Sequence, residues 1–155
     1  MQKKPRYAVD RMLGSLAKWL RILGYDTYYR KHIKPINLVS IAQSQDRAII
    51  TKNRWFLKSK FPIRIIFLNS NSLKDMLREV HAIIPLETDK IFTRCIVCNE
   101  KTIPVQKEEI KDFVPIYVYE HHDEFSRCNG CGKIYWKGTH FERVQNFIEA
   151  HEPGK

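Results

Sequence analysis

The sequence predicts an α/β protein: a small domain with a parallel sheet flanked by helices, followed by a four-cysteine zinc ribbon. In the first half of the chain, short apolar runs alternate with segments of helical periodicity, which is typical of parallel sheets covered on both faces. The second half contains two Cys-x-x-Cys pairs, and paired cysteines of this kind are typical of structural zinc sites.

The predicted elements of the first half follow in order along the chain. Residues 6–10 form a short strand that ends in a carboxylate, and the apolar residues of 12–23 recur every three or four positions, as in a helix. Gly24 stands where a left-handed helix cap is expected. The next elements are predicted as strand 27–29, helix 36–44, strands 47–51 and 63–68, and helix 72–81. This last helix begins with Ser72-Leu-Lys-Asp75, which resembles a capping box with Asp in the usual Glu position.

A linker is predicted at Pro85 and the polar residues 87–90. It divides the chain into a domain of residues 1–88 and a domain of residues 89–155, which holds the cysteines. The second domain is expected to end in a helix, because Thr139-His-Phe-Glu142 forms a good capping box.

The cysteine pairs are the strongest chemical signal in the chain: Cys95 with Cys98, and Cys128 with Cys131. Each pair can form a tight turn that presents two thiolates, and two such turns supply the four sulfurs of a tetrahedral zinc site. The 29-residue insert between the pairs exceeds the roughly 15–20 residues of the commonest pattern, and a β-hairpin excursion would absorb the extra length. A closed four-thiolate site has no open position for water or substrate, so the predicted zinc is structural.

Two alternatives to this zinc site remain open. The cysteines could serve in redox chemistry or form disulfides instead. Nearby histidines could also compete as ligands, and these are His121, His122 and His140. Four cysteines already complete a tetrahedral shell, which favours surface or capping roles for the histidines.

The net charge of +10 is concentrated in the first domain. Residues 1–90 hold 18 Lys and Arg against 7 Asp and Glu, for +11, whereas residues 91–155 hold 9 against 10, for −1. Such a surplus favours a polyanionic partner, either nucleic acid or an anionic membrane surface. The alternative is a solvated basic surface that only aids solubility.

The sequence has no apolar run of the length that a membrane span requires. Its first residues lead directly into a strand-like segment and lack the apolar core of a secretory signal. We therefore expect a cytoplasmic protein that does not span a membrane, in a compartment where thiols stay reduced and available for metal.

Three segments carry a resemblance to a known family. They read Val9-Asp-Arg-Met-Leu-Gly-Ser-Leu-Ala-Lys-Trp-Leu-Arg-Ile-Leu-Gly-Tyr-Asp-Thr27, Ala48-Ile-Ile-Thr-Lys-Asn53 and Phe125-Ser-Arg-Cys-Asn-Gly-Cys-Gly-Lys-Ile-Tyr-Trp-Lys-Gly-Thr-His140. With these motifs nearly the whole chain resembles the Mut7-C family, described as a ribonuclease domain of the PIN fold with a C-terminal zinc ribbon. The resemblance implies a PIN-like domain in which several carboxylates at the carboxyl edge of the sheet hold one or two Mg²⁺ or Mn²⁺ ions.

The chain departs from this pattern at two of the expected acidic positions. Asp10 matches the first acid of the family, but Asn53 stands where the family motif has Asp, and the segment around Asn37 lacks the expected acids. One carboxylate and two amides among basic neighbours have little negative charge with which to hold a divalent cation. We therefore expect cleavage to be lost or weakened. Because an asparagine carbonyl can coordinate a metal, an active Mg²⁺- or Mn²⁺-dependent endoribonuclease is the alternative.

RNA is then the expected partner, with ribosomal RNA or another large structured RNA as the candidates, and DNA stays open as an alternative because phosphate contacts do not distinguish the sugar. Phosphate contacts supply affinity and aromatic rings stack on exposed bases, so basic residues beside aromatic ones are the candidates. The predicted RNA-binding residues are Arg11, Arg30, Lys31, Lys52, Arg54 and Trp55. A third possible function is a protein-interaction or toxin-like module that binds a protein partner through the ribbon and the final helix.

Overall fold

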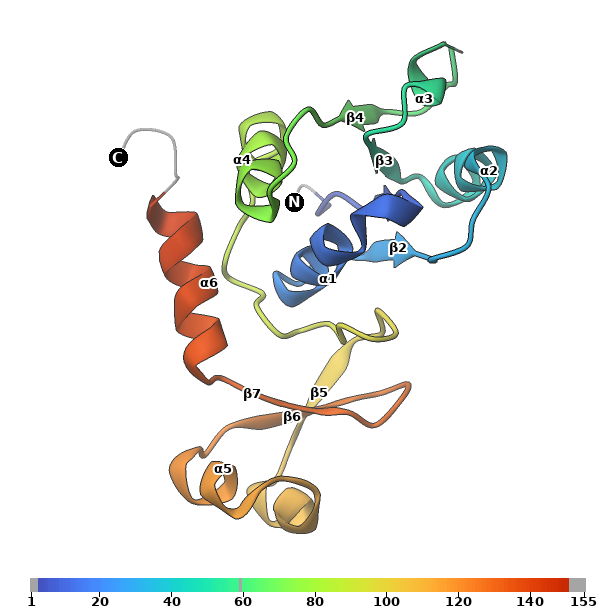
Figure 1. Ribbon diagram of the computed structural model, residues 1–155. Coiled ribbons are helices and arrows are strands. Elements are labelled where there is room, and N and C mark those ends of the chain that lie inside the picture. The colour runs from blue at the N-terminus through green and yellow to red at the C-terminus, as the bar shows by residue number, and fades with distance from the viewer. Residues whose placement is uncertain (1–2, 59, 151–155) are drawn as a thin grey trace. The chain divides into compact units, whose positions relative to one another are not determined.

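The computed structural model describes residues 3–58 and 60–150, without the side chains of Thr139, His140, Phe141 and Val144. The chain divides into two compact units, of which unit 1 is Met1–Arg21 with Tyr25–Leu86 and unit 2 is Ile22–Gly24 with Glu87–Lys155. The mixed α/β architecture, with its parallel four-stranded sheet flanked by helices, confirms the predicted fold class (Figure 1).

None of the helices in the described part of the chain combines the length and the hydropathy that a membrane-spanning helix needs.

The sheet of unit 1 has the strand order β2-β1-β3-β4, and all its neighbours pair in parallel. Its strands are β1 (Tyr7–Val9), β2 (Thr27–Tyr29), β3 (Ala48–Thr51) and β4 (Ile65–Phe67). β2 pairs with one edge of β1, and β3, the next strand along the chain, pairs with the opposite edge of β1. The carboxyl ends of β1 and β3 therefore flank the topological switch point, where ligands bind in open α/β sheets.

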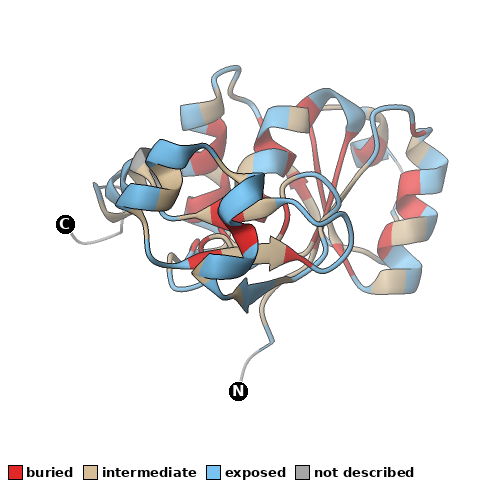
Figure 2. Ribbon diagram, turned by 90° about the horizontal axis from the view of Figure 1, so that it is seen from below, coloured by how far each residue is buried: buried red, intermediate tan, exposed pale blue. Residues whose placement is uncertain are grey.

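Helices cover both faces of this sheet. The strand register places Tyr28, Ala8, Ile49 and Ile65 on one face. This face packs with α2 (Pro35–Gln45) and α3 (Trp55–Lys58) in a cluster of the buried residues Ala8, Ile33, Leu38, Val39, Ala42, Ile49 and Phe56. Figure 1 shows α1 (Gly14–Ile22) and α4 (Leu73–Ile83) on the other side of the sheet. In unit 1 the buried residues follow the strands and one side of the helices that cover them (Figure 2).

The helix predicted over residues 12–23 begins differently from its expected form. Its first turn is a 3₁₀ helix, η1 (Arg11–Leu13), and the regular helix starts at Gly14. The Tyr29 hydroxyl donates a hydrogen bond of 2.8 Å to the Arg11 carbonyl. A Cβ atom at position 14 would lie only 2.8 Å from that hydroxyl, so glycine leaves the room that Tyr29 occupies, and a larger residue would displace the hydroxyl.

Two predicted helix caps are present. Gly24 has a φ of 91°, which confirms the left-handed cap. Ser72 caps α4, because its hydroxyl oxygen accepts the backbone N–H of Asp75 at 3.1 Å. The Asp75 carboxylate accepts the Ser72 hydroxyl at 2.8 Å and not the Ser72 amide, since the side chain of Asp is one methylene shorter than the Glu of a full capping box.

Unit 2 contains an antiparallel sheet in the order β5-β6-β7. Its elements are β5 (Thr102–Val105), η2 (Lys107–Phe113), α5 (Ile116–His121), β6 (Phe125–Cys128), β7 (Ile134–Trp136) and α6 (Thr139–Ala150). The insert between the cysteine pairs is thus more than the expected hairpin, because two short helices join β5 to β6, and the fully buried Ile110 anchors the first of them. The predicted final helix is present as α6, but the side chain of its expected cap, Thr139, lies outside the described residues.

Candidate metal centre and candidate nucleic-acid interface

The two cysteine pairs form the same turn twice. In each pair the sulfur of the first cysteine accepts a backbone N–H from two residues further on: Val97 donates to Cys95 at 3.4 Å, and Gly130 donates to Cys128 at 3.3 Å. Such N–H donors stabilise a thiolate, so both turns are built to present negatively charged sulfur.

The two turns also have the same backbone conformation after the second cysteine. The residue that follows the second cysteine is left-handed in both turns, with a φ of 67° at Asn99 and 80° at Gly132. The first cysteine of each pair donates its own N–H, at 2.8 Å in both turns, to the carbonyl of the residue five positions later, which is Glu100 or Lys133. Asparagine and glycine are the residues that most readily adopt this conformation, which explains their presence at the two positions.

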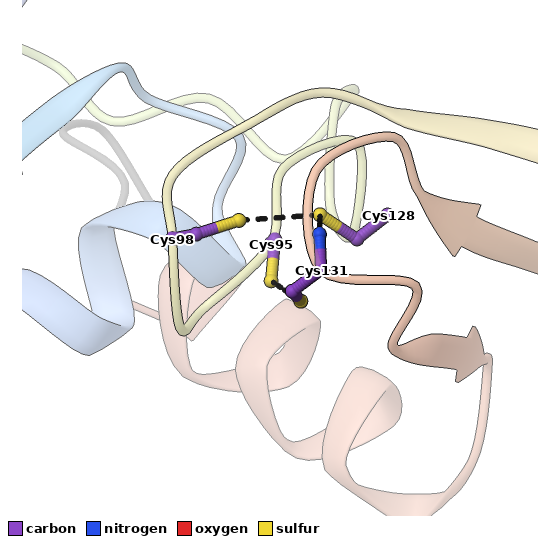
Figure 3. A group of neighbouring side chains, drawn as sticks. All are labelled: Cys95, Cys98, Cys128 and Cys131. Atoms are coloured by element: carbon purple, nitrogen blue, oxygen red, sulfur yellow. Dashed lines mark hydrogen bonds between the residues drawn. The ribbon is translucent and has the colours of Figure 1, made fainter.

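The four sulfurs converge from these two turns (Figure 3). All four lie within 4.8 Å of one another, and the sulfurs of Cys95 and Cys131 are 3.6 Å apart, while those of Cys98 and Cys128 are 3.2 Å apart. A tetrahedral shell with metal–sulfur bonds of about 2.3 Å needs sulfur separations of about 3.8 Å. The cysteines are not joined as disulfides, and their spacing fits one tetrahedral metal ion.

The thiols differ strongly in acidity when no cation is bound. Desolvation opposes ionisation of Cys95, but hydrogen bonds from the Tyr135 hydroxyl and from the amides of Cys98 and Val97 lower its pKa to about 6. The pKa of Cys98 is raised to about 12: the Glu100 amide favours its thiolate, but desolvation and the neighbouring sulfurs of Cys128 and Cys95 outweigh it. Ionisation of Cys95 therefore makes ionisation of the neighbouring cysteines less favourable. A bound dication would remove this repulsion, because it stabilises all four thiolates together.

Tyr135 supports the metal centre from β7. Its hydroxyl donates to the Cys95 sulfur at 3.0 Å and accepts the backbone N–H of Ile96, also at 3.0 Å. The side chain is buried, and desolvation followed by the bond to Cys95 raises the pKa of its phenol. Sequence reasoning missed this residue, although a tyrosine in the strand directly after the second cysteine pair was an available signal.

We expect Tyr135→Phe to weaken metal binding about tenfold, because partners of metal ligands typically contribute a factor of 10–100. The dissociation constant can be measured by competition with a chromophoric chelator, using Zn²⁺ and Co²⁺. The Co²⁺ thiolate charge-transfer bands should also shift, since Cys95 loses a hydrogen-bond donor. Tyr119→Phe is the control, because the Tyr119 ring contacts Lys107 and Lys111 and not the cysteines. Equal affinities for the two variants would contradict this role.

The two described histidines near the cysteines lie beside aromatic rings. The His121 ring stacks on Tyr117 at 4.0 Å between centroids, and His122 lies 6.5 Å from the ring of Trp136. The side chain of His140 lies outside the described residues. Of the described side chains, only the four cysteines form a group of three or more that could share a metal ion.

A second candidate site lies at the switch point of the parallel sheet. Asp10 directly follows β1 and is 1% exposed. One of its carboxylate oxygens accepts the Arg11 backbone N–H at 2.8 Å, and the other accepts the Thr51 hydroxyl at 2.7 Å. Thr51, in turn, accepts the backbone N–H of Asn53 at 2.9 Å. This chain of hydrogen bonds ties the ends of β1 and β3 together.

Sequence reasoning named Asp10 and Asn53 as site residues but missed Thr51, which connects them. A polar residue at the end of an otherwise apolar buried strand was the available signal. The Asn53 side-chain oxygen accepts the Trp55 backbone N–H at 3.0 Å and so caps α3. Asn37 is exposed on the first turn of α2, the helix that follows β2.

Five predicted RNA-binding residues lie just past the carboxyl ends of three neighbouring strands. Arg11 follows β1 by two residues, Arg30 and Lys31 follow β2, and Lys52 and Arg54 follow β3. We refer to these five residues as the basic edge. Lys52 is partly buried and hydrogen-bonds the Asn71 side chain, while the other four are exposed, with Arg30 lying 5.9 Å from the Tyr28 ring centroid. The parallel sheet thus brings together cations that are up to 43 positions apart in the sequence.

Trp55, the predicted stacking residue, is only partly exposed. Its ring lies 4.9 Å from Phe56 and 5.4 Å from Phe61, between ring centroids, and packs against the core cluster under α2. Much of the indole surface is therefore buried by packing, and only its exposed part is available to stack on a base.

A comparison with known protein families was made for the chain. A family model described as the Mut7-C RNAse domain matches residues 5–148, which include both the switch point and all four cysteines. No curated protein matches the chain.

Proposed function

Because the chain belongs to the Mut7-C RNAse domain family, we propose that it binds structured RNA and that its cleavage activity is lost or greatly weakened. The observation that carries this proposal is the composition of the switch point. One buried carboxylate, already hydrogen-bonded within the chain, stands there beside the five cations of the basic edge. Such an edge suits a phosphate backbone better than a divalent cation.

The positive charge of unit 1 favours RNA binding. Phosphate contacts dominate the affinity of proteins for nucleic acids, and unit 1 carries the charge surplus of the chain. The basic edge gathers part of this surplus at the place where open α/β sheets bind their ligands. A large structured RNA, such as a ribosomal RNA, offers the high phosphate density that this charge favours.

The switch point has few of the ligands that a catalytic metal ion needs. Hydrolysis assisted by Mg²⁺ or Mn²⁺ requires several hard oxygen ligands, and carboxylates supply the negative charge that holds the ion. Asp10 is the one carboxylate described at the switch point, and the side-chain oxygen of the neutral Asn53 caps α3. Asn37 adds no charge, and Lys52 and Arg54 add repulsion. An active endoribonuclease is the rival function, which the family description favours.

The four cysteines are proposed to hold one structural Zn²⁺ ion. Zinc favours four thiolates in a tetrahedral shell, and the sulfur spacing fits this shell. When bound, the ion would fix the two turns to each other and would leave no position for a substrate. A thiolate site of this kind requires a reducing compartment such as the cytoplasm.

A protein partner of the ribbon is a second candidate function. The insert between the cysteine pairs exposes large apolar side chains, with Phe113 at 69%, Ile116 at 74% and Tyr117 at 65% exposure. Such side chains are unusual on a free surface when they are close together, and they favour an interaction site.

RNA binding by the basic edge is tested by neutralising Lys52 and Arg54 together, as glutamines. We expect weaker binding and a salt dependence whose slope is smaller by about 1.4, or about 0.7 for each lost contact with single-stranded RNA. The measurement is fluorescence anisotropy with labelled RNA over a range of salt concentrations. Lys3→Gln with Arg64→Gln is the matched control, because these exposed residues precede β1 and β4, at the opposite edge. A slope that changes equally in both double variants would exclude the basic edge.

A further inference from the structure

Two backbone N–H groups of the loop after β4 bind the carboxylate of Glu79. The Asn69 N–H lies 3.2 and 3.0 Å from the two oxygens of the Glu79 side chain, and the Ser70 N–H donates to one of these oxygens at 2.7 Å. Glu79 reaches this loop from α4. Consecutive backbone N–H groups that point at one anion form the kind of concave site that also binds phosphate.

The charge of Glu79 is stabilised at this place. Desolvation opposes its ionisation, but hydrogen bonds from the Ser70 side chain and from the Asn69 and Ser70 amides, together with the Lys52 charge, lower the pKa of the carboxyl. Lys52 belongs to the basic edge and is tied to the same loop by its hydrogen bond to the Asn71 side chain. The anion site is therefore continuous with the basic edge.

We propose that the Asn69 and Ser70 amides, together with Lys52, form a subsite for one phosphodiester group of bound RNA, which Glu79 occupies in the free protein. This inference rests on the proposed RNA binding. A phosphodiester carries the same single negative charge as the carboxylate and also offers two oxygens, so the exchange keeps both N–H donors paired. Glu79 is only partly buried, so its displaced carboxylate can move into solvent without an uncompensated buried charge.

In this arrangement Glu79 competes with RNA for the two amides and for Lys52. A neutral glutamine of the same length competes less well. Glu79→Gln should therefore bind a single-stranded RNA about threefold to fivefold more tightly than the wild-type protein, the range expected for one partly exposed charge contact. The gain should disappear when Lys52→Gln is added to the same variant, because the subsite then lacks its cation.

The matched control is Asp46→Asn. It removes the same charge at an exposed position beyond the C-terminus of α2, before β3 and so at the opposite edge of the sheet. Asn tolerates the left-handed conformation of this residue, whose φ is 52°. If Asp46→Asn raises RNA affinity as much as Glu79→Gln, the effect is one of net charge alone and the subsite is refuted.

A measurement on the wild-type protein avoids any dependence on variant folding. NMR spectra would follow the Asn69 and Ser70 amides and the Glu79 side-chain carboxyl carbon during titration with inorganic phosphate and, separately, with RNA. The subsite predicts that all three signals shift together with either ligand. RNA binding that leaves them unchanged would overturn the subsite and keep the proposed function, whereas RNA that does not bind at all would overturn both.

Discussion

Removing the proposed zinc ion should unfold the zinc ribbon of unit 2, around the four cysteines, while the α/β unit 1 keeps its structure. The buried cluster beside the metal centre consists of Cys95, Cys128 and Tyr135, with Phe92 and Ile96 packed against it. Two of its three buried members are therefore proposed metal ligands. Without the ion, four close sulfurs must stay protonated or repel one another, and the turns lose the bonds that join them. In small zinc modules the binding free energy, about 10–16 kcal/mol, is also the folding free energy.

This expectation can be measured with a chelator and with Cys128→Ser. Elemental analysis of protein purified without chelator should find one zinc ion for each chain. After chelation, amide NMR signals of residues 95–136 should collapse toward unfolded positions, while those of β1 to β4 remain dispersed. Ser126→Ala is the control, because Ser126 lies on the same strand and is not a ligand. Metal-free protein with an intact ribbon spectrum would contradict a structural role for the ion.

Replacing Asp26 with Ala should destabilise the α/β unit by about 3–5 kcal/mol, the usual cost of leaving a buried charge without its partner. One oxygen of Asp26 pairs with Arg47 at 2.7 Å, and the other pairs with Arg6 at 3.1 Å. The Arg47 side chain is 6% exposed and also donates to the Tyr7 carbonyl at 3.2 Å. These bonds join the amino ends of β1 and β2 to the end of α2.

The matched control for Asp26→Ala is Arg78→Ala. Arg78 pairs with Asp75 at a similar 3.1 Å, but both side chains are about half exposed, at 44% and 51%. Exposed pairs contribute at most about 1 kcal/mol. Urea unfolding followed by NMR signals of β1 and β3 separates this unit from the ribbon. A loss of less than about 1 kcal/mol for Asp26→Ala would mean that water replaces the lost carboxylate.

The strands β1 to β4, the helices α1, α2, α4 and α6 and the four-cysteine group were predictable because they depend on local signals, whereas α3 and the two short helices of the insert were not predicted. Periodicity, a capping serine at position 72 and a glycine at position 24 act within a few residues. The cysteines were predictable because the spacing within each pair alone specifies the tight turn. The 3₁₀ start of the first helix was not predicted; the contact that the Tyr29 hydroxyl makes with it, at the Arg11 carbonyl 18 positions away, is not a local signal.

The missed residues of the two sites share this non-local origin. Thr51 meets Asp10 across 41 positions, and Tyr135 meets Cys95 across 40. Glu79 points back to a loop ten positions earlier, in a direction that the helical pattern alone does not specify. Each of these contacts depends on how helices and strands pack against one another. The sequence can therefore indicate that a polar residue near a strand end is a candidate site residue, but it cannot identify the partner of that residue.

The central claim is that this member of the family binds RNA without cleaving it efficiently, and one gel experiment tests it most directly. Labelled structured and single-stranded RNAs would be incubated with wild-type protein and with Asp10→Asn in Mg²⁺, Mn²⁺ or EDTA, and each sample run on native and denaturing gels. We expect shifted but intact RNA in every condition, because the basic edge needs neither the metal nor the buried Asp10 carboxylate. A cleavage product that requires Mn²⁺ or Mg²⁺ and is lost in Asp10→Asn would contradict the claim and identify a working nuclease.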